Sequence, residues 1–281
     1  MKADEIKREK MAEQYRSRIN LAVDYIENYL SKDFTLDELA RVAGFSKYHF
    51  HRIFYTFSGE SLFQFIQRLR LEKAATALIN HPARPVTDIA LECGFANSSS
   101  FAKSFKQYFG YTATAWRDLG CAACMRESNV GKKKSNSGQL LSKDGKVKKP
   151  LNLYIEYEQN TQIWRYEMME NVKRVVEVKD FPETTLAYVR YVGPYKGDGQ
   201  LFEGLFSKLF SWAGPRGLLN YPDTKTIIIY HDNPEITDET KLRVSVSISV
   251  PADTAVEGEI GKMVLPTGKY ALAQFELTDD E

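Results

Sequence analysis

Two stretches of this chain share one pattern and decide its fold: Gly44–Phe54 (GFSKYHFHRIF) and Gly94–Phe105 (GFANSSSFAKSF). Each has an apolar-Ala pair four or five residues before its glycine and a second glycine five residues after its last phenylalanine; these are Leu39-Ala40, Ile89-Ala90, Gly59 and Gly110. The agreement predicts two copies of one helix-turn-helix, in which a turn at the glycine joins two short helices.

Local signals define the first copy. Thr35 and Glu38 have the spacing of a capping box, which predicts a short helix that runs through Val42. Gly44 supplies the permissive backbone of the turn, and Ser46 can cap the second helix. On that second helix the spacing separates an apolar face from a polar face; the first holds Phe50, Ile53, Phe54 and Phe57, and the second holds Tyr48, His51 and Arg52.

Two further helices frame the copies. Apolar residues at helical spacing predict an amphipathic helix before the first copy; they are Ile19, Val23, Ile26 and Leu30. A long connecting helix is predicted from Ser61, its cap, to about Asn80, because Pro82 and Pro85 cannot continue it. The second copy should then run from Val86 to about Leu119, with Asn97 or Ser98 as the cap of its second helix.

The small net charge of +1 hides an uneven distribution. Residues 1–120 hold 17 Lys and Arg against 14 Asp and Glu, residues 121–150 hold 8 against 2, and residues 151–281 hold 13 against 21. The net charges are therefore +3, +6 and −8. A basic N-terminal part suits a polyanion, which the acidic C-terminal part would repel.

After Pro150 the hydrophobic period changes from helical to alternating, which predicts an α+β domain. We expect a hairpin near residues 154–166, strands over 174–178, 184–192, 226–231 and 242–250, and a helix over 201–213. In the last of these strands one face should be buried, and the face of Arg243 and three serines should be exposed. Residues 261–275 echo residues 178–191, so we expect a repeated strand-helix-strand-strand unit whose second copy is incomplete, as in a truncated chain.

The expected organisation is multi-domain: an N-terminal tail over 1–16, an all-α double helix-turn-helix domain over 17–120, a basic flexible linker over 121–150 and an α+β domain over 151–281. The N-terminus has no apolar run typical of a secretory signal or a membrane anchor. The three cysteines fit a reducing compartment, so we expect a cytoplasmic protein. No spacing of histidines, cysteines or carboxylates singles out a metal, cofactor or catalytic site, and we expect none.

The N-terminal part resembles the DNA-binding domain of AraC/XylS-type transcription regulators. The resemblance is strongest over the residues that match the family signature: Ile89-Ala90, Gly94-Phe95, Phe101, Lys103, Phe105-Lys106, Phe109-Gly110 and Trp116-Arg117. Ala113 departs from the usual Pro, and Lys103 from the commoner Arg. The resemblance implies that the second helix of each copy enters a major groove of double-stranded DNA, the two grooves being about 34 Å apart.

By position in that motif, six residues are expected to face the DNA grooves: Tyr48, His51, Arg52, Ser98, Ser99 and Lys103. Arg52 is the best candidate for reading a base, because a guanidinium can form two hydrogen bonds with a guanine edge. Serines are short and less selective. We therefore expect the first half-site to be read more strictly than the second.

The C-terminal part, over about 175–281, resembles gyrase-inhibitor-like (GyrI-like) effector-binding domains. The residues that carry the resemblance include Ala187-Tyr188-Val189, Val192-Gly193-Pro194-Tyr195 and Leu242-Arg243. It implies a cleft for a small effector, often cationic and aromatic, which the acidic charge would suit. Tyr195, Trp212 and Tyr230 are the candidate effector-binding residues.

These features predict a transcription regulator that binds a small effector and contacts RNA polymerase. Two alternatives stay open: a module that sequesters drugs or binds a protein without signalling to DNA, and a GyrI-like hydrolase fused to a DNA-binding domain.

Overall fold

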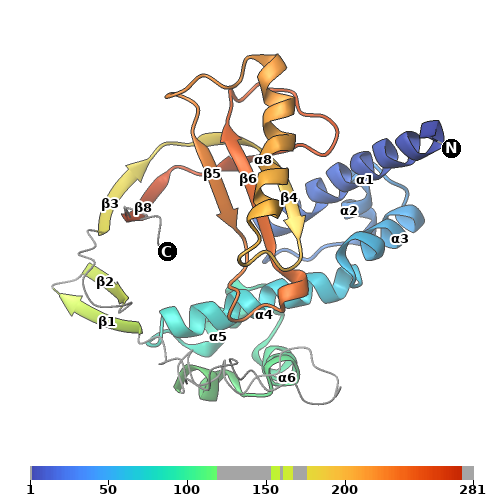
Figure 1. The fold of residues 1–281 in the computed structure, drawn as a ribbon. Coiled ribbons are helices and arrows are strands. Elements are labelled where there is room, and N and C mark those ends of the chain that lie inside the picture. The colour runs from blue at the N-terminus through green and yellow to red at the C-terminus, as the bar shows by residue number, and fades with distance from the viewer. Residues whose placement is uncertain (1, 119–152, 159–160, 167–175, 274–281) are drawn as a thin grey trace, which may run out of the picture.

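A computed structural model describes residues 2–118, 153–158, 161–166 and 176–273. Its N-terminal part is helical (Figure 1), with elements α1 (Lys2–Asn28), α2 (Leu36–Val42), α3 (Lys47–Ser58), α4 (Leu62–Asn80), α5 (Val86–Glu92) and α6 (Ser98–Phe109). The two predicted helix-turn-helix copies are thus confirmed as α2–α3 and α5–α6, joined by α4. The predicted linker, with Cys121 and Cys124, lies outside the described residues.

Capping follows the sequence with two differences. Ser46 stands at the N-cap of α3, as predicted, but its side chain forms no cap hydrogen bond. Ser61 and Gln64 form a complete capping box at the start of α4, and Asn97 Oδ1 accepts a hydrogen bond from the backbone N–H of Ser100. Thr35 accepts one from the N–H of Glu38, but the Glu38 carboxylate accepts hydrogen bonds from Tyr25 and Lys32 instead of reaching back to residue 35. Only half of that predicted box is therefore formed.

Helix α1 is longer than the sequence predicted. It begins at Lys2, so residues assigned to an N-terminal tail are helical. Each helix-turn-helix copy has its own apolar core, one around Phe50, Phe54 and Leu39 and the other around Phe101 and Phe105. Helix α1 belongs to the first core through Ile19, Ala22, Val23 and Ile26.

The C-terminal part is α+β. Its elements are β1 (Leu153–Glu158), β2 (Thr161–Tyr166), β3 (Val176–Phe181), β4 (Thr184–Val192), α8 (Gly199–Ala213), η1 (Gly214–Arg216), β5 (Thr226–Tyr230), η2 (Glu239–Lys241), β6 (Arg243–Ser249), β7 (Gly261–Leu265) and β8 (Gly268–Ala273). Strands β5-β6-β4-β7 form an antiparallel sheet in that order, while β1 pairs with β2 and β3 with β8. The predicted hairpin is confirmed, and β4 has the predicted limits.

The central sheet is covered on both faces. On one face, Ala187, Val189 and Val246 pack against Leu205 and Leu209 of α8. The other face lies against α1, which passes behind the sheet in Figure 1. Helix α4 lies below the sheet in the same view.

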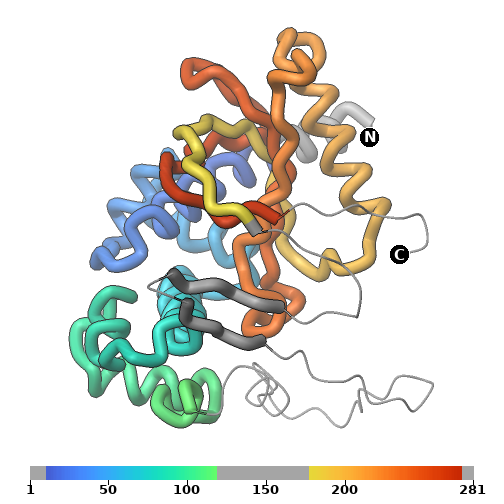
Figure 2. The backbone as a smooth tube through the Cα atoms, turned by 90° about the vertical axis from the view of Figure 1, so that its left-hand side faces the viewer, coloured from blue at the N-terminus to red at the C-terminus, as the bar shows by residue number. Residues whose placement is uncertain are grey.

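The prediction of an exposed face on β6 was therefore wrong. Arg243 is 3% exposed, and Ser245 and Ser247 are fully buried. The alternation of that strand correctly separates apolar from polar side chains. It cannot reveal that a helix more than 200 positions earlier in the chain covers the polar side. Figure 2 shows this helical part of the chain beside the sheet strands.

Candidate functional site

Helices α3 and α6 present the residues expected to read DNA. Tyr48 is 87% exposed, and the other five members of that set are also exposed: His51, Arg52, Ser98, Ser99 and Lys103. None of the six side chains forms an ion pair within the described residues. On the opposite faces of the two helices, Phe50, Phe54, Phe101 and Phe105 are fully buried, so packing fixes the direction in which the polar residues point.

A second polar cluster lies where α1 meets the sheet. Asp24 of α1 accepts a hydrogen bond from the Tyr188 hydroxyl at 2.5 Å and pairs with the Arg190 guanidinium at 2.8 Å. Glu27, one turn further along α1, pairs with Arg243 at 2.5 Å. Both arginines are buried, and neither apolar periodicity nor a local motif indicated this contact between the two parts of the chain.

The cluster continues behind Arg243. Asp232 accepts hydrogen bonds from the Arg243 backbone N–H and from its guanidinium. His231 Nε2 lies 2.8 Å from the Ser245 hydroxyl, and its Nδ1 lies 3.7 Å from a Glu27 oxygen. A neutral ring with the proton on Nδ1 satisfies both contacts.

A third group of charges joins α4 to the loop before β6. Glu60 pairs with Arg68 at 2.7 Å and with Lys241 at 3.1 Å, while Arg68 also contacts Glu72 at 3.2 Å. The Tyr108 hydroxyl donates a hydrogen bond to Glu72. Because Lys241 belongs to the C-terminal part, this network ties the connecting helix α4 to the sheet as well.

Burial and nearby charges shift the pKa values of Asp24 and Glu27 in opposite directions. Burial raises the pKa of Asp24, and the nearby Arg190 offsets only part of that rise. Burial would also raise the pKa of Glu27, but Arg243 and Arg190 outweigh it, so that pKa is lowered. Burial and the positive charge of Arg190 lower the pKa of His231 to about 3, so the ring is neutral at neutral pH.

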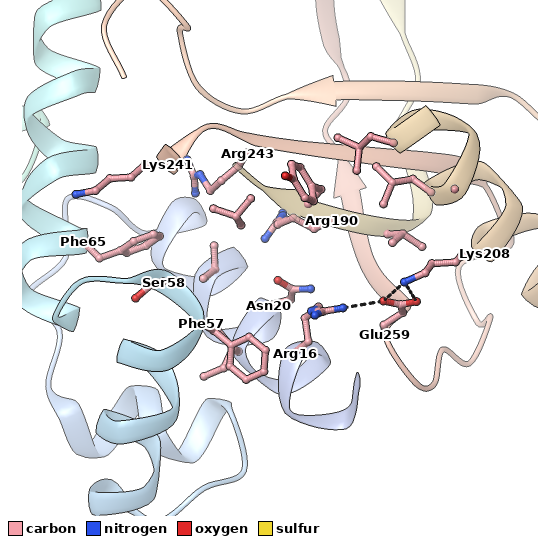
Figure 3. Close-up of a pocket in the computed structure, with 18 of the residues that line it drawn as sticks. Arg16, Asn20, Phe57, Ser58, Phe65, Arg190, Lys208, Lys241, Arg243 and Glu259 are labelled. Atoms are coloured by element: carbon pink, nitrogen blue, oxygen red, sulfur yellow. Dashed lines mark hydrogen bonds and ion pairs between the residues drawn. The ribbon is translucent and has the colours of Figure 1, made fainter. Parts of the chain in front are cut away.

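A cavity of about 410 Å³ opens between the two parts of the chain. Its lining comes from α1, α3, α4, β4 and α8 and from the segments around β6 and β7, so neither part forms it alone. Figure 3 shows Asn20 of α1 on the side of the cavity opposite Arg190 of β4, and Arg16 directed toward Glu259, which is bound to both Arg16 and Lys208.

The three candidate effector-binding residues lie elsewhere. Tyr195 is 5% exposed, and its ring centroid is 5.5 Å from that of Tyr230, which is 57% exposed. Trp212 is buried in the core under α8, where its indole nitrogen has no hydrogen-bond partner among the described residues. The structure thus brings Tyr195 and Tyr230 together but does not place Trp212 with them, and none of the three lines the interdomain cavity.

The comparisons with known proteins divide the chain at the same place. Residues 39–118 match the family description of a helix-turn-helix domain, and residues 174–281 match that of a GyrI-like small molecule binding domain. Within the described residues, no helix has the length and apolar content needed to cross a bilayer.

Curated relatives match the helical part. The right origin-binding protein of Escherichia coli K12 is 37% identical over 93 residues, which is 33% of this chain and 32% of that protein. "Probable transcription factor PqrA" of Proteus vulgaris is 32% identical over 104 residues, which is 36% of this chain and 84% of PqrA. The chain thus spans only about a third of the length of the right origin-binding proteins that it matches.

Among solved structures, the DNA-binding domain of AdpA in complex with a target DNA is 23% identical, with a TM-score of 0.35; the match covers 37% of this chain and 92% of that one. The double helix-turn-helix, the matched domain and the extent of the PqrA match together give the class: this chain belongs to the AraC/XylS family of transcription regulators, and it carries a GyrI-like domain behind its DNA-binding domain.

Proposed function

We propose that this protein is a sequence-specific DNA-binding regulator whose α3 and α6 read two half-sites and whose C-terminal domain binds a small effector. The observation that carries the proposal is that six polar residues of these two helices are exposed and form no ion pair within the part of the chain that the structure describes. The docked C-terminal domain leaves the six DNA-facing residues exposed, so this arrangement is compatible with binding DNA.

The contacts of the C-terminal domain support a role in regulation. They fall on α1, which packs on α3 through the first core, and on α4, which connects the two reading helices. A ligand that changes this docking would act on the elements that set the relative position of α3 and α6. Such a regulator would alter how RNA polymerase uses a neighbouring promoter.

The chemistry of the effector is argued from local surfaces. The acidic charge of residues 151–281 favours a cation, and the Tyr195–Tyr230 pair offers aromatic rings to it. The interdomain cavity has a different lining, with basic side chains and an apolar wall. Both surfaces suit a small molecule with an aromatic or apolar body. The proposed effector is therefore defined here by that body and not by the sign of its charge.

Selection of binding sites from a random pool of duplex DNA tests the proposal. The full chain should enrich two conserved half-sites about one helical turn apart, with more information in the half-site read by α3. The Arg52→Ala variant should lose the preference in that half-site alone. Failure of the full chain to enrich any sequence would rule the proposal out.

A second arm of the experiment separates regulation from sequestration. Affinity for the selected DNA and transcription from a promoter that carries it are measured with and without a bound ligand. Regulation predicts a shift in at least one of them. Ligand binding without any shift would leave sequestration as the role of the C-terminal domain.

A further inference from the structure

Two residues that line the interdomain cavity, Asn20 and Arg190, each hold a buried hydrogen-bond donor that has no partner within the described part of the chain. Asn20 of α1 is 7% exposed and Arg190 of β4 is 6% exposed. Among the described residues, Asn20 Nδ2 and Arg190 Nη1 form no hydrogen bond. An unsatisfied buried donor costs roughly 1–3 kcal/mol, so these two donors favour an occupant of the cavity, water or a ligand, that supplies acceptors.

The charged side chains of the cavity wall have one dominant sign. Of the described residues that line it, six are basic and one is acidic; they are Arg16, Arg68, Arg190, Lys208, Lys241, Arg243 and Glu259. The carboxylates that neutralise the buried arginines, such as Asp24 and Asp232, lie behind them and do not line the cavity. The wall therefore offers N–H donors to a ligand.

Near Arg16, a single carboxylate, that of Glu259, forms ion pairs with two basic side chains of the cavity wall. Glu259 pairs with Arg16 at 3.1 Å and with Lys208 at 2.8 Å. Because a single negative charge faces two positive charges there, an anionic group can approach this side favourably.

The remaining wall is apolar. Its apolar lining includes Ile19 and Val23 of α1, Phe57 of α3, and Leu201 and Leu205 of α8. The volume of about 410 Å³ lies within the range of about 300–1,000 Å³ that is usual for small-molecule sites. The site thus combines a donor-rich part with an apolar part.

We propose that this cavity binds a small amphipathic anion, whose carboxylate, sulfonate or phosphate group accepts hydrogen bonds from Asn20 and Arg190 and whose hydrophobic body packs between α1 and α8. The site deepens the proposed function, and as an effector site it rests on that function. It also shows why the charge of −8 over residues 151–281 is a poor guide to this ligand: the wall is built from both parts of the chain, and its acids are already paired.

A pair of fluorescent dyes tests the anionic part of the proposal. Anilinonaphthalene sulfonate and phenylnaphthylamine share the same ring systems, and only the first carries a sulfonate. The full chain should bind the sulfonate dye at least about tenfold more tightly, because a charge-assisted hydrogen bond is about twice as strong as a neutral one. Equal or weaker binding of the sulfonate dye would overturn the proposed anion preference.

The Asn20→Leu variant tests one of the two donors. Leucine has as many side-chain heavy atoms as asparagine but no N–H group. The variant should bind the sulfonate dye about tenfold more weakly and the neutral dye no more weakly than the wild type. Unchanged affinity for the sulfonate dye, or an equal loss for both dyes, would show that Asn20 is not a ligand contact.

A third variant tests the location. Gly204 lies in α8 on the cavity wall, and a Cβ there would have no atom within 4 Å, so Gly204→Phe should fold and obstruct the cavity. Gly199, in the same helix, is equally open and does not line the cavity, so Gly199→Phe is the matched control. Only the first should abolish dye binding. Equal dye binding by both variants would place the dye elsewhere and overturn the site.

These readouts do not involve DNA. If the dyes behave as expected but no DNA sequence is enriched, the ligand site stands and the proposed function fails. If DNA is enriched but Gly204→Phe binds the sulfonate dye normally, the function stands and the site fails.

Discussion

Gly44 and Gly94 occupy equivalent turns in the two helix-turn-helix copies, but their surroundings differ. Both have a positive φ, +66° and +89°. A Cβ at Gly44 would have no atom within 4 Å, whereas one at Gly94 would lie 2.8 Å from Arg70 Nε and 2.9 Å from the Leu30 carbonyl oxygen. That guanidinium donates a hydrogen bond to the same carbonyl, so the contact has little room to yield.

Alanine at the two turn glycines should therefore have unequal effects. Gly44→Ala should lower the free energy of unfolding by about 1 kcal/mol, the cost of a left-handed backbone. Gly94→Ala should lower it by roughly 1–3 kcal/mol more, because of the clash. Urea titration of the full chain measures both, and equal losses would contradict the packing described around Gly94.

At the level of single DNA contacts, Arg52 should matter more than the serines of α6. Arg52→Ala should weaken binding to the selected DNA by about tenfold to a hundredfold, which corresponds to one bidentate base contact. Ser99→Ala, the comparison variant in the other helix, should change the affinity by less than about threefold. Fluorescence anisotropy at fixed salt measures both, and the reverse order would refute the unequal reading of the half-sites.

His231 should make stability depend on pH. Its pKa is lowered to about 3 in the folded protein by burial and by Arg190, against 6.5 for an ordinary histidine. The folded state therefore disfavours the protonated ring. Its contribution to stability is complete above pH 6.5 and falls with pH down to about 3. Between pH 7 and pH 5 the loss should be about 2 kcal/mol.

The His231→Gln variant isolates this contribution to the pH dependence. Glutamine keeps a polar group near Ser245 but does not titrate. Glu27, with its lowered pKa, titrates only below this pH window, and Asp24, with its raised pKa, acts in the opposite direction in both proteins. Urea titration gives the free energy of unfolding of both proteins. The difference between wild type and variant should shrink by about 2 kcal/mol from pH 7 to pH 5. A constant difference would contradict a buried neutral ring.

At the scale of elements, α1 serves two partners at once. Its apolar face joins the core of the first helix-turn-helix, which residues 19–30 predicted correctly. Its acidic face pairs with the sheet, and the sequence did not predict this, because Asp24 and Glu27 have the ordinary pattern of a solvated helix face. Helix and strand limits could be predicted because caps, prolines and periods are local. The pairing of distant faces could not, since it depends on tertiary contacts.

The Glu27→Gln variant tests how strongly α1 holds the sheet. Losing this carboxylate leaves the Arg243 guanidinium with Asp232 as its remaining ion-pair partner among the described residues. We expect docking to weaken by roughly 1–3 kcal/mol, less than for a fully buried pair, because the Glu27 side chain keeps 24% of its exposure.

Hydrogen exchange measures this loss. Protection should fall in α1 and β6 while α5 and α6 stay unchanged. Asp33→Asn, an exposed acid without an ion pair among the described residues, is the matched control and should change nothing. Unchanged protection of α1 in Glu27→Gln would mean that the acidic face does not hold the domains together.

At the scale of the whole molecule, the basic character of the helical part, +3 over residues 1–120, bears on how it would bind DNA. DNA binding should depend steeply on salt, with a log–log slope of roughly −5 to −8 if six to nine phosphates are neutralised. Titrations between low and physiological salt measure this slope. A flat dependence would contradict DNA binding through the helical domain.

The exposure of the six polar residues on α3 and α6 could be predicted from the sequence, because a repeated local motif carries them. The sequence could not predict the interdomain cavity, because Asn20 of α1 lines the same cavity as Arg190 and Lys208 only when the two distant parts of the chain pack together. Tyr195, Trp212 and Tyr230 are aromatic residues of an acidic segment, but the sequence does not show that Trp212 belongs to a core in the fold.

The central claim is that one molecule binds DNA and a small anion and that the two sites are coupled through α1 and α4. The most direct test is the affinity of the full chain for anilinonaphthalene sulfonate with and without saturating selected DNA, together with its affinity for that DNA with and without the dye. Coupling of about 1–3 kcal/mol predicts that both affinities change by the same factor, roughly 5 to 150, and that Gly204→Phe abolishes the change. If each ligand binds with the same affinity whether or not the other is present, the two sites are independent and the claim is wrong.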